Sequence, residues 1–167
     1  MIRYKFSNGM NILFVGINPH YGSFRRGIPF SNNKMFWYLL SKAKIIAENS
    51  GDLKNDAKLK EIYHKKFNQV YNLGFLNVIN RPTQDISQLK KGEESAGRRK
   101  ILKVVKEYKP KVVCFIGKIT YEKFSNSKNF DFGWQNNLHD SRVYVMHFPL
   151  RGKASIRVKE LKALLQD

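Results

Sequence analysis

The strongest constraint on the fold is a set of short, almost wholly apolar runs separated by segments with helical periodicity. The runs lie at residues 11–15, 75–79 and 112–116, and residues 142–147 form a less regular run rich in β-branched and aromatic side chains. Strands this apolar must be covered on both faces, and parallel strands need crossover connections. The pattern therefore predicts a three-layer α/β/α sandwich with a mostly parallel central sheet of about four strands, in a single domain over residues 1–167.

Between these runs, apolar residues recur at helical spacing. They predict helices over residues 34–48 and 59–70, a helix that ends before Pro110, and a final helix over residues 154–165. Gly74 is suited to a left-handed cap after the second helix. Two segments rich in Asn, Ser, Asp and Gly, residues 49–58 and 125–140, are predicted to be loops.

Charge points to the kind of partner. The chain has 31 Lys and Arg against 13 Asp and Glu, a net charge of +18. So large an excess indicates a polyanionic partner, with nucleic acid first, although a generally Lys-rich proteome is the alternative explanation. No apolar segment approaches the ~18 residues that span a bilayer, so no membrane partner is expected. The single cysteine, Cys114, lies in an apolar run and is predicted to be a buried core residue in a reducing cytoplasm.

Sequence motifs for metal and nucleotide chemistry are missing. There is no Cys/His zinc spacing, no Gly-x-Ser-x-Gly elbow and no Gly-rich loop ending in Gly-Lys-Ser/Thr, so no metal and no cofactor are expected. Asp85 and Asp140 have no obvious catalytic partner. Any chemistry must rest on positioning and electrostatics more than on a carboxylate pair. The best candidate is a polar residue at a strand exit, Asn18 in the turn Val15-Gly16-Ile17-Asn18-Pro19.

A set of motifs in a fixed order resembles a known family. The motifs are Gly16-Ile17-Asn18-Pro19, Gly27-Ile28-Pro29-Phe30, Phe36-Trp37, Asn77-Val78-Ile79-Asn80-Arg81-Pro82-Thr83, Lys109-Pro110 and Gly117-Lys118. Together they resemble the mismatch-specific uracil/thymine-DNA glycosylase branch of the uracil-DNA glycosylase superfamily, over about residues 10–165. The resemblance implies a monofunctional glycosylase of base-excision repair. Such an enzyme flips a deaminated base, above all uracil opposite guanine, out of double-stranded DNA and leaves an abasic site.

The resemblance also implies roles for individual residues. Asn18 would position the attacking water, and Phe30 would stack on the flipped base. The backbone amide of Ile17 and the hydroxyl of Ser23 correspond to positions that line the base pocket, and His147 corresponds to a histidine that aids the departing base in uracil-specific relatives. Taken alone, these residues have simpler readings: a turn cap for the asparagine, a loop hydroxyl for the serine, and core or structural roles for the rings.

Two departures from the family pattern change the expectations. The family commonly has Gly after the Asn-Pro pair, where this chain has His20, a ring expected to bias the pocket toward uracil over thymine. The exit of the last strand keeps the Pro, Gly and Ser of the family's duplex-probing loop but gains two cations. The simpler interpretation of Arg151 and Lys153 is a run of solvated charges, and the functional interpretation is contact with DNA phosphates. The predicted DNA-binding residues are Lys118, Arg151, Gly152, Lys153 and Ser155.

Two other functions stay open at this point. A non-catalytic, basic nucleic-acid-binding module on the same fold would bind DNA in a salt-dependent way without cleaving it. An RNA-processing or nucleotide-handling enzyme would act on RNA or free nucleotides. For the glycosylase, we expect a cytoplasmic monomer that associates with the nucleoid when it is bound to DNA.

Overall fold

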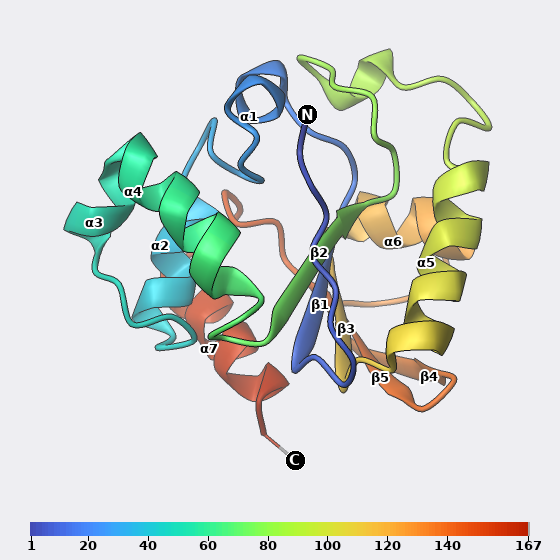
Figure 1. The fold of residues 1–167 in the computed structure, drawn as a ribbon. Helices are drawn as coiled ribbons and strands as arrows, with labels where there is room; N and C mark the ends of the chain where they lie inside the picture. The colour runs from blue at the N-terminus through green and yellow to red at the C-terminus, as the bar shows by residue number, and fades with distance from the viewer. Residues whose placement is uncertain (167) are drawn as a thin grey trace.

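The fold is built on a five-stranded sheet in the order β2-β1-β3-β5-β4, seen in a computed structural model that describes residues 1–166 (Figure 1). Asp167, the last residue of the predicted domain, lies outside the described residues. The parallel strands are β1 (Ile12–Gly16), β2 (Leu73–Asn77), β3 (Val112–Ile116) and β5 (Ser141–Met146). At the edge, β4 (Gly133–Leu138) pairs antiparallel with β5. The mostly parallel sheet is confirmed, with five strands in place of the predicted four.

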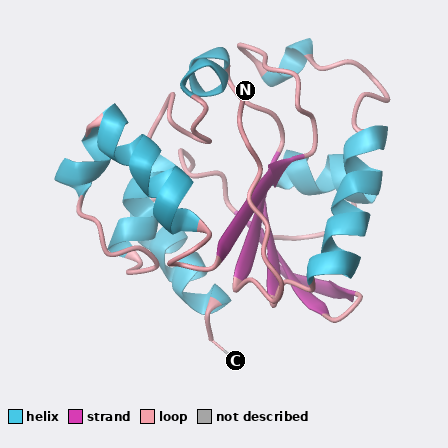
Figure 2. Ribbon diagram, in the orientation of Figure 1, coloured by secondary structure: helices cyan, strands magenta, loops and turns pink. Residues whose placement is uncertain are grey.

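Helices cover both faces of the sheet (Figure 2). Alternate residues of each strand feed the two cores: Phe14 belongs to one and Val15 to the other. The first face carries α2 (Met35–Lys42), α3 (Ser50–Lys54), α4 (Asp56–Glu61), the π-helix η1 (Ile62–Phe67) and α7 (Ala154–Leu164). The second carries α5 (Ser95–Tyr108) and α6 (Lys118–Ser125). The three-layer α/β/α sandwich is therefore confirmed. Two short helices, α1 (Tyr21–Arg26) and the 3-10 helix η2 (Ile86–Gln88), complete the described elements.

The apolar runs form central strands because every residue of β1, β2 and β3 is buried. Cys114 is a fully buried core residue of β3, as predicted, and burial raises the pKa of its thiol well above the usual range. Within residues 1–166, no helix is long and apolar enough to cross a membrane.

The start of β2 corrects one prediction. Gly74 does not cap a helix, because it lies inside β2, which begins at Leu73 rather than at residue 75. The left-handed conformation falls on Asn72, with φ of 55°. Glycine is needed at position 74 for a different reason: a Cβ there would lie 2.9 Å from the carbonyl oxygen of Lys5.

Two predicted helices are shorter than their periodicity indicates. The helix expected over residues 34–48 stops at Lys42, because Lys44 has φ of 58° and the chain turns away. The helix expected over residues 59–70 is instead α4 followed by η1. The helix ends at Phe67, so Tyr63 is buried while Val70, predicted on the buried face, lies in the turn that follows and is 64% exposed.

Both segments predicted to be loops contain regular structure. Residues 49–58 hold α3 and the start of α4, because Asn49 and Asn55 act as N-caps whose Oδ1 atoms accept backbone N–H groups at 3.0 Å. Residues 125–140 hold β4, an edge strand that is half exposed along its length. Cζ of Arg142 in β5 lies 3.9 Å from the ring centroid of Trp134 in β4. A cation therefore covers this ring, where a helix would cover a central strand.

Candidate active site

A cleft of about 760 Å³ opens at the carboxyl ends of the parallel strands. This is where parallel sheets bind ligands, and the volume falls in the range of about 300–1,000 Å³ found for ligand pockets. Residues that follow β1, β2, β3 and β5 all contribute to its walls. The predicted site residues that line the cleft are Ile17, Asn18, His20, Ser23, Phe30, Lys118, His147 and Arg151.

The turn that carries Asn18 is held by the loop that follows β2. Backbone pairing of β1 with β2 continues beyond both strands: Ile79 N donates to Ile17 O at 2.8 Å, and Thr83 N donates to Pro19 O at 3.1 Å. The Asn-Pro turn is therefore supported along its length, and Asn18 sits on a rigid part of the backbone.

The Asn18 side chain is held by its amide nitrogen. Nδ2 donates to Thr83 Oγ1 at 2.9 Å and to the Arg81 carbonyl at 3.0 Å, with the Pro19 carbonyl at 3.4 Å. Carbonyl oxygens only accept hydrogen bonds, so these contacts decide which end of the amide is nitrogen. Oδ1 makes no hydrogen bond within residues 1–166, which leaves it as a free acceptor on a residue that lines the cleft.

Space in the cleft depends on Gly16. A Cβ at this position would lie 2.5 Å from Asn77 Oδ1 and 3.2 Å from the tip of the Phe30 ring. Phe30 has φ of 56°, a strained conformation for a bulky residue, and its ring packs on Phe36 and Phe75 with centroids 4.5 and 5.5 Å apart. Asn77, only 4% exposed, ends β2 and lines the cleft. Sequence reasoning missed it as a site residue, although it stood in one of the quoted motifs.

Ser23 connects α1 to the segment that follows Phe30. The Ser23 hydroxyl is buried, and its Oγ accepts the backbone N–H groups of Ser31 at 3.1 Å and Asn32 at 2.9 Å. The hydroxyl therefore fixes the path of this segment and keeps its hydrogen for donation.

His20 is the N-cap of α1. Its Nδ1 accepts the backbone N–H of Gly22 at 3.0 Å, so a neutral ring carries its hydrogen on Nε2. The His20 backbone also bridges to Thr83. The ring is therefore held in the cleft wall by its hydrogen bond to Gly22, and the backbone by its β-bridge to Thr83.

His147 follows β5 and lies flat on Phe132, with ring centroids 3.6 Å apart and planes at 15°. Its Nδ1 lies 3.1 and 3.2 Å from the two carboxylate oxygens of Glu160. Glu160 is 8% exposed and also accepts from Arg157 Nε at 3.3 Å and the Tyr144 hydroxyl at 3.2 Å. Sequence reasoning did not identify Glu160, because the contact depends on α7 folding back onto β5.

A family model described as the uracil DNA glycosylase superfamily matches residues 4–160. The chain belongs to the uracil DNA glycosylase superfamily. Membership implies DNA glycosylase activity toward uracil, that is, hydrolysis of an N-glycosidic bond in base-excision repair. The matched segment contains all the cleft residues described above, so the resemblance at the level of the superfamily is confirmed.

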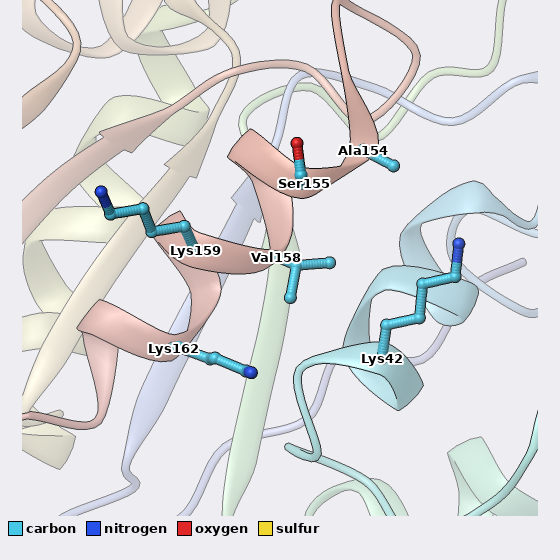
Figure 3. A pocket seen from close by; sticks show the side chains of 6 residues that line it. All are labelled: Lys42, Ala154, Ser155, Val158, Lys159 and Lys162. Carbon is cyan, nitrogen blue, oxygen red and sulfur yellow. The ribbon is translucent and has the colours of Figure 1, made fainter.

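The predicted DNA-binding residues of the glycosylase lie in three places: the cleft, the loop beyond it and a separate hollow. Lys118 and Arg151 line the cleft, and Gly152 and Lys153 are exposed in the loop beyond it. Ser155 instead borders a separate hollow of about 490 Å³ between α2 and α7, where Figure 3 shows lysines on both walls. The residues that line this hollow are Lys42, Ala154, Ser155, Val158, Lys159 and Lys162.

Exposed apolar side chains lie beside these cations in the glycosylase. Leu150, in the loop between β5 and α7, is 51% exposed, and Phe148 and Ile119 are also exposed. All three line the cleft. Proteins that distort DNA insert such apolar wedges into the base stack. Leu150 is the first residue of the segment 150–155 that was predicted to probe the duplex, but it was not among the individual residues predicted to bind DNA.

The acidic residues weighed from the sequence take no part in an acid/base pair. Asp85 lines the cleft, but its Oδ1 accepts the Ser87 backbone N–H at 2.8 Å as the N-cap of η2, and this hydrogen bond lowers the pKa of Asp85. Asp140 lies in the turn between β4 and β5, outside the cleft. Among residues 1–166, no group of three or more His, Cys, Asp or Glu is placed to hold a metal ion.

Proposed function

We propose that this glycosylase is monofunctional and mismatch-specific, and that it excises flipped uracil opposite guanine from double-stranded DNA. One observation carries the proposal: Asn18 is anchored through Nδ2 by Thr83 and Arg81, while its Oδ1 stays a free acceptor in the cleft. Family membership supplies the reaction, and this arrangement supplies a way to perform it.

Glycosidic bond cleavage passes through an oxocarbenium-like sugar. Such an electrophile needs a well-placed water more than a strong base. A water that donates a hydrogen bond to Asn18 Oδ1 would direct its lone pair at C1′ of the flipped nucleotide. Fixing the amide in advance lowers the entropic cost of bringing water and sugar together.

Three residues suit a flipped uracil. Phe30 supplies an aromatic face, and base–aromatic stacking is worth about 1–3 kcal/mol. Asn77 offers one amide donor and one amide acceptor, which match the O4 and N3–H of uracil. Cytosine presents the opposite pattern, so this amide would reject it only while the amide keeps the orientation that suits uracil. We propose that the fixed ring of His20 closes the space that the 5-methyl group of thymine would need.

The loop between β5 and α7, at the edge of the cleft, carries side chains that can bind a distorted duplex. Arg151 and Lys153 would contact phosphates, and Leu150 would occupy the space left by the flipped base. Lys153 is the N-cap of α7 but makes no side-chain cap hydrogen bond, so the first N–H groups of the helix are available to a phosphate near Ser155. Gly152, with φ of 68°, shapes the loop between them.

The proposal of a monofunctional enzyme rests on the environment of Lys118. Its ammonium lies 5.7 and 5.2 Å from the ring centroids of Phe130 and Phe132. These cation–π contacts hold the Lys118 ammonium against the two rings. Borohydride trapping of a covalent DNA adduct would contradict this part of the proposal.

The proposed function is tested with a panel of single-lesion duplexes and single strands, each incubated with the wild-type protein and then treated with alkali. The panel carries uracil, mismatched thymine, hypoxanthine, xanthine and alkylated cytosine. We expect alkali-dependent breaks, fastest in the duplex with uracil opposite guanine. Salt-dependent binding with no alkali-sensitive sites would indicate a non-catalytic binding module, and product from RNA or free nucleotides would indicate the third class of function.

A further inference from the structure

The contact between His147 and Glu160 decides where the histidine carries its hydrogens. Both carboxylate oxygens lie within 3.2 Å of Nδ1, and an ionised carboxylate only accepts hydrogen bonds. Nδ1 must therefore carry a hydrogen. We infer that Glu160 is a positioning residue which makes His147 act on the departing base as an imidazolium that donates from Nε2. The inference rests on the proposed function of the same cleft.

The carboxylate of Glu160 is surrounded by hydrogen-bond donors. Arg157, 1% exposed, places its guanidinium against the carboxylate, and the Tyr144 hydroxyl and the His147 backbone N–H both donate to it. A buried counter-charge and two further donors therefore face the same carboxylate, which accepts from each of them. Burial, followed by the charge of Glu160, raises the pKa of Tyr144 and of the nearby Cys114 thiol, so these two groups stay neutral.

A neutral His147 would be poorly suited to the departing base. Its one hydrogen would sit on Nδ1, and Nε2 would then present a lone pair to the cleft. A lone pair repels the negative charge that grows on uracil O2. Only the doubly protonated ring can donate from Nε2, and the stacked face of Phe132 stabilises a cation. Lys118 and Arg151 line the same cleft and oppose the added charge, which makes the Glu160 carboxylate necessary.

The reaction balances with this assignment. The C1′–N1 bond breaks, and its electron pair leaves with the base. The oxygen of water bonds to C1′ and one water proton passes to solvent. His147 Nε2–H donates a hydrogen bond to the base anion, which takes up one proton, so the products are uracil and an abasic sugar.

A structural role is the competing explanation, because Glu160 also ties α7 to β5. Single-turnover excision rates measured across pH separate the two explanations. We expect the wild-type rate to fall on the alkaline side, and Glu160→Gln to move that fall to lower pH by about one unit and to lower the rate at pH ~7.5 about tenfold. His147→Gln should remove the alkaline fall. Glu48→Gln is the matched control, because Glu48 accepts from Lys66 and Tyr71 at 2.9 and 2.6 Å outside the cleft.

A second measurement uses only wild-type protein and holds even where Glu160→Gln fails to fold. Long-range ¹H–¹⁵N NMR correlation at alkaline pH identifies the protonated nitrogen of the neutral His147 ring, and we expect Nδ1. A hydrogen on Nε2 would overturn the inference. Excision by both proteins with identical pH profiles would also overturn it and leave the proposed function intact, whereas no excision by the wild type would refute the proposed function itself.

Discussion

Replacing Thr83 with Val tests whether the anchoring of Asn18 matters for excision. The Asn18 amide has two hydrogens, and its two shortest contacts are Thr83 Oγ1 at 2.9 Å and the Arg81 carbonyl at 3.0 Å. Valine keeps the shape of threonine but accepts no hydrogen bond. One hydrogen bond is worth about 0.5–1.5 kcal/mol, and the Pro19 carbonyl at 3.4 Å replaces only part of it.

If the lost hydrogen bond raises the activation free energy of excision by about 1.4 kcal/mol in Thr83→Val, the excision rate falls about tenfold. The backbone hydrogen bond from Thr83 N to Pro19 O persists, so duplex affinity should be unchanged. The assay is single-turnover cleavage of a duplex with uracil opposite guanine. Ser141→Ala is the control, because it removes a buried hydrogen bond to the Pro110 carbonyl at the opposite end of β5. A Thr83→Val rate within about twofold of wild type, with the fold intact, would refute the anchoring argument.

Three further predictions concern specificity, acid/base chemistry and DNA contact. His20→Gly should raise excision of thymine relative to uracil opposite guanine in duplex assays; equal wild-type rates that the variant leaves unaltered would contradict the role of the ring. Asp85→Asn should keep the rate within about threefold, because Asn is also a good N-cap, and a loss of a hundredfold would instead make Asp85 a general base. Arg151→Ala and Lys153→Ala should each reduce the slope of log affinity against log salt by about 1, and an unchanged slope would exclude phosphate contact.

The central strands are largely predictable, because strands that are buried on both faces are made almost wholly of apolar residues. The run at residues 112–116 matches β3 at both ends. β4 leaves no such mark, because an edge strand with solvent beside it needs no apolar alternation. Asn49 and Asn55 show a second limit: asparagine favours both turns and helix N-caps, and only the residues that follow decide between them.

Some residues of the candidate site could likewise be predicted from the sequence, and others could not. Asn18 and Phe30 lie in local motifs, so the sequence singles them out, and the structure brings both to one cleft. Asn77 lies in a run predicted to be a buried strand, so it was not predicted as a site residue. Glu160 meets His147 only because α7 packs back onto β5, a contact across thirteen positions that no local spacing encodes.

The most direct test of the central claim is the single-turnover excision rate of Asn18→Ala on a duplex with uracil opposite guanine, measured alongside its affinity for the same duplex. The anchored amide orients the attacking water, so we predict a loss of about 10²-fold or more in rate with duplex affinity retained. Full activity in Asn18→Ala would contradict the account, because water would then reach C1′ without the Asn18 amide.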